Sequence, residues 1–109
     1  MNINQLKSLI GEFEILVKTI SNDSAYIEKM LNCQREIYNG FYEVQANSLK
    51  VANLDFDSRE LDVIDIDINN LAFDDEYQMK INDEDIYDLI DLLCKFNDEI
   101  QKLKKMINS

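Results

Sequence analysis

The 109-residue sequence predicts an α+β fold in which helices dominate. Three observations lead to this expectation. Apolar residues recur every three or four positions near both ends of the chain, which is typical of amphipathic helices. Between these regions, apolar and acidic residues alternate, which is typical of half-buried strands. The chain has the length of one domain. We therefore expect a single domain over 1–109, with helical residues at 3–48, a short antiparallel β-ribbon or meander at 50–81, and an amphipathic helix at 84–107.

The N-terminal region carries one continuous heptad pattern. Its stripe runs from Ile3 to Phe41, and neighbouring apolar residues widen it to the face of a core-packing helix. One helix over 3–47 would be roughly 68 Å long and would need a partner along its whole length. The run from Ser21 to Ser24 contains poor helix formers that favour N-caps. We therefore expect either one long helix or, preferably, a helical hairpin that breaks at 21–24.

The middle of the chain changes to a period of two. The segment from Val63 to Ile68 alternates β-branched residues with aspartates, as in a strand with one buried face. Asp57 to Glu60 is a plausible hairpin connection, and Asn69-Asn70 a plausible second turn. The expected inward residues of a third strand are Tyr77, Met79 and Ile81. The aromatic residues expected to pack the ribbon onto the helices are Tyr38, Phe41 and Tyr42.

The C-terminal region has the most regular pattern. Asn82 or Asp83 is expected to cap a helix, with acidic residues in its first turn and lysines in its last turns, as the helix dipole favours. Its seam is apolar at every heptad step. The seam residues are Ile86, Leu89, Leu93, Phe96, Ile100, Leu103 and Ile107.

Negative charge is concentrated between Asp55 and Asp91. Fourteen acidic residues stand there against Arg59 and Lys80, whereas the whole chain has a net charge of −11. Nucleic acid and anionic membranes would be repelled, so the expected partner is a basic protein surface. On strands, acids two positions apart would form a row with a spacing of roughly 6.6–6.8 Å, able to occupy sites that bind phosphates. The candidate partner-binding residues are Asp55, Asp57, Asp62, Asp65, Asp67, Asp74, Asp75, Glu76, Asp83, Glu84, Asp85 and Asp88.

The sequence argues against an enzyme. It has no histidine to serve as a base or metal ligand, and its two glycines form no phosphate-binding loop. One set of residues matches the ligand spacing of an EF-hand calcium loop: Asp65, Asp67, Asn69 and Glu76. Asn70 stands where that loop needs glycine, and isoleucines fall between the ligands. We therefore expect no metal and no cofactor. Cys33 and Cys94 lie in helical patterns and are expected to be reduced, buried thiols.

In its small size, its acidity, its lack of catalytic residues and its Met1-Asn2-Ile3-Asn4 start, the chain resembles phage-encoded anti-CRISPR proteins that mimic nucleic acid. The resemblance implies a non-enzymatic inhibitor that blocks the nucleic-acid channel of a CRISPR effector. The sequence contains neither a signal peptide nor a membrane span, so the expected location is the cytoplasm of a bacterial host.

Two alternatives remain open at this point. One is an immunity protein or antitoxin that neutralises a basic nuclease toxin, which would use the same electrostatic attraction. The other is a coiled-coil structural or chaperone-like protein, which would use the apolar stripe and form a homodimer through its helical seam.

Overall fold

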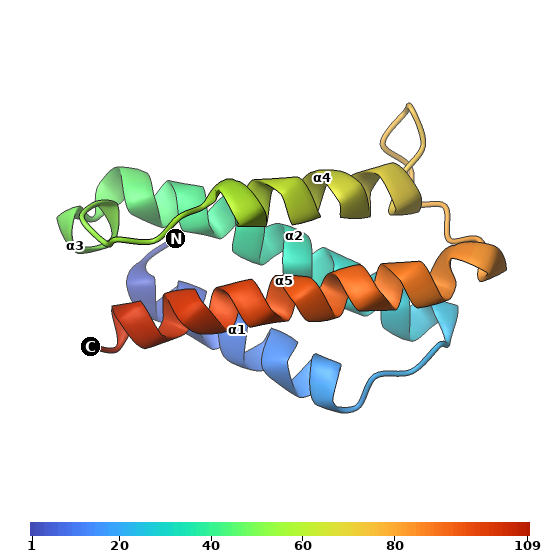
Figure 1. Ribbon diagram of the computed structural model, residues 1–109, viewed down its shortest axis with the longest axis horizontal. Coiled ribbons are helices and arrows are strands. Elements are labelled where there is room, and N and C mark those ends of the chain that lie inside the picture. Colours follow the sequence, from blue (N-terminus) through green and yellow to red (C-terminus); the bar gives the residue numbers. More distant parts are fainter.

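The computed structural model describes residues 1–109 and contains only helices as regular elements. The four long helices are α1 (Ile3–Lys18), α2 (Ser24–Asn47), α4 (Arg59–Ala72) and α5 (Ile86–Ile107). A short helix, α3 (Leu49–Ala52), follows α2, and a 3₁₀ turn, η1 (Asp83–Asp85), precedes α5. Each long helix runs antiparallel to the next, and α5 packs back against α1, which closes an up-and-down four-helix bundle (Figure 1). None of these helices has both the length and the apolar composition needed to cross a membrane.

The predicted α+β fold is therefore wrong, because the segment 50–81 forms no sheet. The stretch expected to turn at Asp57 to Glu60 instead leads into α4, and Asn69-Asn70 lies within that helix. Of the expected third strand, only one isolated antiparallel bridge exists, between Phe73 and Met79. The protein is all-α, with 76% of its residues in helices.

This segment is helical because its buried apolar residues recur every three or four positions over a longer stretch than the alternation covers. Leu61, Ile64, Ile68 and Ala72 follow steps of three and four and are all buried on one side of α4. The alternation over Val63 to Ile68 covers only six residues. Over so short a stretch, the apolar residues fit the spacing of a strand and also the spacing of a helix. Packing against α5 decides in favour of the helix and leaves Val63 and Ile66 exposed.

The N-terminal stripe breaks where the poor helix formers predicted it would. α1 ends at Lys18 and α2 begins at Ser24. Asp23 accepts a hydrogen bond from the Ala25 amide (3.2 Å) and so caps α2. The start of α1 is fixed by a capping box between Asn2 and Gln5. The preferred helical hairpin is thus confirmed.

The core lies between the four long helices. Every predicted seam residue of α5, from Ile86 to Ile107, is buried. Phe96 meets Phe13 of α1 edge to face, with ring centroids 5.6 Å apart. The prediction of this helix is confirmed, but the predicted cap at Asn82 or Asp83 is wrong. Asn82 makes no side-chain cap, and Asp83 is the first residue of the 3₁₀ turn that leads into α5.

The two glycines differ in their surroundings, and this predicts the outcome of replacing them. A Cβ at Gly11 in α1 would meet no atom within 4 Å, whereas one at Gly40 in α2 would collide with the side chain of Met1. Gly11→Ala should therefore raise the free energy of unfolding by about 0.5–1 kcal/mol, through the lower entropy of the unfolded chain. Gly40→Ala should gain less, because Met1 must move. Urea unfolding followed by circular dichroism measures both. A larger gain for Gly40→Ala would contradict the close packing of Met1.

Candidate acidic interface

The acidic residues of the middle segment are now placed on helices and loops. Eight of the twelve predicted partner-binding residues are exposed: Asp55, Asp57, Asp67, Asp75, Glu76, Asp83, Glu84 and Asp88. Asp62, Asp74 and Asp85 are half-buried, and Asp65 is buried with an exposed fraction of 7%. We define the acidic surface as the seven exposed acids between residue 67 of α4 and residue 91 of α5: Asp67, Asp75, Glu76, Asp83, Glu84, Asp88 and Asp91. Asp55 and Asp57 precede α4 and so lie at its other end.

The centre of this surface is a shallow groove between α4 and α5. Three carboxylates line it, from Asp67 on α4 and from Asp88 and Asp91 on α5, together with Asn70, Leu71 and Leu92. Asp88 and Asp91 are three positions apart, which brings them to the same side of their helix. The expected row of acids on a strand is therefore wrong, and the anions are held instead by two packed helices.

Little of this negative charge is neutralised within the molecule. Among the acids from Asp55 to Asp91, only two form ion pairs: Asp57 with Arg59 (2.7 Å) and Asp91 with Lys95 (3.2 Å). The Arg59 guanidinium lowers the pKa of Asp57 to about 2. Both pairs are exposed, and such pairs contribute little to stability. The remaining charge produces a negative potential that extends into the solvent.

Asp65 belongs to a different arrangement, and its assignment to a partner-binding face is wrong. Its carboxylate accepts hydrogen bonds from Gln34 Nε2 of α2 (2.7 Å) and from Asn69 Nδ2 of α4 (3.1 Å). Burial raises the pKa of Asp65, although both amide donors and the charge of Arg35 oppose that shift. Residues 65 and 67 would share a face on a strand but point to different sides of a helix. Asp65 therefore serves the fold, and Asp67 remains at the surface.

Asp62 extends this buried polar contact between α2 and α4. Its Oδ1 accepts hydrogen bonds from the hydroxyls of Tyr38 (2.8 Å) and Tyr42. We call the whole contact the polar layer; its residues are Gln34, Tyr38, Tyr42, Asp62, Asp65 and Asn69. Tyr38, Phe41 and Tyr42 pack the middle segment onto α2, as predicted. That segment is a loop followed by a helix rather than a β-ribbon. The ring of Phe41 contacts that of Phe56 in the loop, with ring centroids 5.5 Å apart.

The calcium-loop match has no structural counterpart. Asp65, Asp67 and Asn69 lie within α4, where Asp67 points away from the other two, and Asp65 is already hydrogen-bonded to Asn69 and Gln34. Glu76 lies in the following loop. No group of three or more histidine, cysteine or carboxylate side chains is arranged to hold a metal ion.

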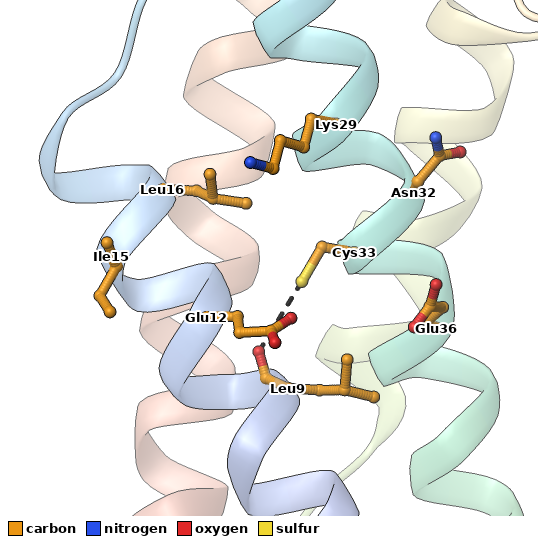
Figure 2. A pocket seen from close by; sticks show the side chains of 8 residues that line it. All are labelled: Leu9, Glu12, Ile15, Leu16, Lys29, Asn32, Cys33 and Glu36. Carbon is orange, nitrogen blue, oxygen red and sulfur yellow. Dashed lines mark hydrogen bonds between the residues drawn. The ribbon is translucent and has the colours of Figure 1, made fainter.

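A second groove lies between α1 and α2, a location that the sequence did not indicate (Figure 2). Its apolar part consists of Leu9, Ile15, Leu16 and Cys33, although Leu9 and Leu16 were expected in the core. Charged residues surround these side chains, and Figure 2 shows Glu12 and Lys29 among them. Cys33 donates its thiol hydrogen to the Leu9 carbonyl (3.7 Å). Burial, with Glu12 and Glu36 nearby, raises the pKa of Cys33 to about 12, so this cysteine is not an activated nucleophile.

These surroundings predict a slow reaction of Cys33 with thiol reagents. Both cysteines are free, but Cys33 is buried and Cys94 half-buried. At pH 8 a thiol with a pKa near 12 holds on the order of 1000-fold less thiolate than an ordinary one. In Cys94→Ser, Cys33 should therefore react with a disulfide reagent on the order of 1000-fold more slowly in the folded protein than in urea. Labelling of folded Cys33 as fast as Cys94 in Cys33→Ser would contradict its burial.

Comparison of the chain with known protein families, with curated proteins and with solved structures finds no match. The interpretation of the acidic surface therefore depends on its own geometry and charge.

Proposed function

We propose that this protein is a non-enzymatic inhibitor that binds a basic nucleic-acid-handling protein through its acidic surface. One observation carries the proposal: the acidic surface gathers exposed carboxylates on α4, α5 and their connection with almost no cations to neutralise them. Residues 1–54, by contrast, hold six acids against five bases and are nearly neutral. Such crowding costs stability through self-repulsion, a cost that solubility alone would not require.

The partner's chemistry follows from the charge. A surface that takes the place of nucleic acid must present anions where the partner expects phosphates, and Lys and Arg clusters provide such sites. The groove acids Asp67, Asp88 and Asp91 come from two packed helices and are therefore held in a fixed arrangement. Long-range attraction would also speed the encounter. By its resemblance to phage-encoded inhibitors, the target is a CRISPR effector in the cytoplasm of a bacterial host. A nuclease toxin would fit the same charge pattern, and identification of the bound protein separates the two.

The apolar stripe favours this proposal over a coiled-coil assembly. The seam residues of α5 and the stripe residues Leu6, Ile10 and Phe13 of α1 are buried within one chain. A homodimer through that seam would therefore require the bundle to open.

The experiment compares two variants of equal net charge. One neutralises the groove acids (Asp67→Asn, Asp88→Asn, Asp91→Asn), and the other neutralises three exposed acids of α1 and α2 (Glu12→Gln, Glu28→Gln, Glu36→Gln). Each immobilised protein is incubated with bacterial host lysate at increasing NaCl concentrations, and the bound proteins are identified by mass spectrometry. Urea unfolding verifies that both variants fold.

We expect wild type to retain a basic nucleic-acid-binding protein that salt releases. The groove variant should retain at most about one tenth of the amount of this protein that wild type retains, whereas the α1–α2 variant should retain the wild-type amount. Equal losses in the two variants would show that net charge alone acts, and would refute a localised interface. Retention of the protein's own copies alone, indifferent to salt, would replace the proposal with self-association.

A further inference from the structure

The acidic surface also carries exposed apolar side chains, which a purely electrostatic interface does not need. Six large apolar residues of the chain are exposed. Four of them lie in the acidic segment: Val63 (52%), Ile66 (55%), Tyr77 (74%) and Tyr87 (73%). Each of these four is next to an acidic residue in the sequence. Exposed apolar side chains and exposed acids therefore occur together on α4, on the following loop and at the start of α5.

On α4 the apolar groups form a defined patch. Val63 and Ile66 are three positions apart and lie on the same side of the helix. Asp67, the next residue, lines the groove towards α5, so the patch borders the acids of that groove. The opposite side of α4 holds Ile64 and Ile68 in the core, which leaves Val63 and Ile66 without a packing role.

The loop after α4 holds Tyr77 in a fixed and exposed position. Its φ of 60° is in the left-handed region, which is uncommon for a residue with a side chain. Asp74 stabilises this turn, because its Oδ1 accepts hydrogen bonds from the amides of Glu76 and Gln78 (2.9 Å each). The aromatic ring is thus presented to solvent beside Asp75 and Glu76.

The presence of both kinds of group in one region points to one class of binding site. Proteins that bind duplex DNA without opening it contact phosphates and groove edges, whereas the faces of its bases are stacked inside. Proteins that bind single strands combine a basic groove for the phosphates with aromatic platforms for the bases. A mimic of a single strand therefore needs acids and exposed apolar groups side by side.

We propose that the acidic surface occupies a site that normally binds single-stranded nucleic acid. Asp67, Asp88 and Asp91 take the place of phosphates, and Val63 and Ile66 take the place of bases on the partner's aromatic side chains. This inference rests on the proposed function and adds to it the form of nucleic acid with which the protein competes.

The test uses two probes and two variants. Host proteins are first bound to the immobilised wild-type protein at 100 mM NaCl. At about this ionic strength, charges still attract each other over roughly 10 Å. The bound proteins are then eluted with a single-stranded oligothymidylate or with a duplex of equal length. Retention by the variant Val63→Ser/Ile66→Ser is measured over a series of NaCl concentrations. The control is Ile15→Ser/Leu49→Ser, which removes the two exposed large apolar residues outside residues 55–91.

We expect the single strand to elute the retained protein at about ten-fold lower concentration than the duplex, because only the single strand offers unstacked bases. Val63→Ser/Ile66→Ser should lower retention at every salt concentration without changing its dependence on salt, and the control should behave as wild type. More effective elution by the duplex, or equal retention by the two variants, would overturn the inference while leaving charge-driven binding intact. Absence of any retained basic protein would overturn both proposals.

Discussion

Replacement of Phe96 by alanine is expected to lower the free energy of unfolding by about 3–5 kcal/mol, the largest effect of any single substitution proposed for this chain. Phe96 is fully buried, and it packs edge to face on Phe13 where α5 meets α1. The substitution removes the apolar area of the ring, leaves a cavity between the helices and breaks the aromatic pair. Urea unfolding followed by circular dichroism measures the change.

The same helix provides the control for this substitution. Tyr87→Ala also removes an aromatic ring from α5, but that ring is mostly exposed, so its loss should change the unfolding free energy by less than about 0.5 kcal/mol. Equal effects of the two substitutions would mean that α5 does not turn its heptad seam into the core.

The second large effect is expected at Asp65. Asp65→Ala should destabilise the protein by about 1–3 kcal/mol, because the buried side-chain amide of Gln34 and that of Asn69 lose their acceptor. Asp67→Ala, two residues away, removes an exposed carboxylate from a crowded negative surface and should leave stability unchanged or slightly raise it. Urea unfolding of the two variants distinguishes the helix α4 from the predicted strand directly. On a strand with both aspartates outward, the two variants would behave alike, and that result would contradict the helix.

Asp65→Asn removes the charge at this buried position and keeps one oxygen that can accept a hydrogen bond. Burial raises the pKa of Asp65, so the folded protein holds a proton at this carboxyl to higher pH than the unfolded chain does. Protonation at Asp65 therefore favours folding, and the cost of its charge appears as pH rises through the folded-state pKa. Wild type should gain stability relative to Asp65→Asn as pH falls from 7 towards about 4, where the unfolded carboxyl also titrates. A difference that is constant with pH would contradict burial of the charge.

The parts of the fold that the sequence predicted well are those with long, regular patterns. The seam of α5 holds seven apolar residues at unbroken heptad steps. Only a helix places all seven on one side, where they can be buried together. The break between α1 and α2 was signalled by four poor helix formers, and Asp23 supplied the cap. In both places local preference and tertiary packing agree.

The segment around α4 was predicted wrongly because its short alternation agrees with two structures. Ile64, Ile66 and Ile68 fit one face of a strand, while Leu61, Ile64 and Ile68 fit one face of a helix. β-branched residues weighted the choice towards the strand, and packing against α5 reversed it. The inward position of Asp65 was beyond prediction, since it depends on Gln34 from a helix that is distant in sequence.

For the candidate site, the charge could be predicted but its arrangement could not. The concentration of acids is a property of the sequence, and most of the predicted residues are indeed exposed. The meeting of Asp67 with Asp88 and Asp91 in one groove requires the packing of α4 against α5. The shared exposed side of Val63 and Ile66 was missed for the same reason, because a strand would have placed these two residues on opposite faces.

The central claim is that the acids of α4 and α5 touch the lysines of a basic partner. A carbodiimide joins a carboxylate to an amine only when the two are in contact. Cross-linking of the retained complex, followed by mass spectrometry, therefore tests this claim most directly. We predict cross-links from Asp67, Asp88 or Glu76 to partner lysines that also bind the nucleic acid. Cross-links that come instead from Glu12, Glu28 or Glu36, on α1 and α2, would contradict the claim.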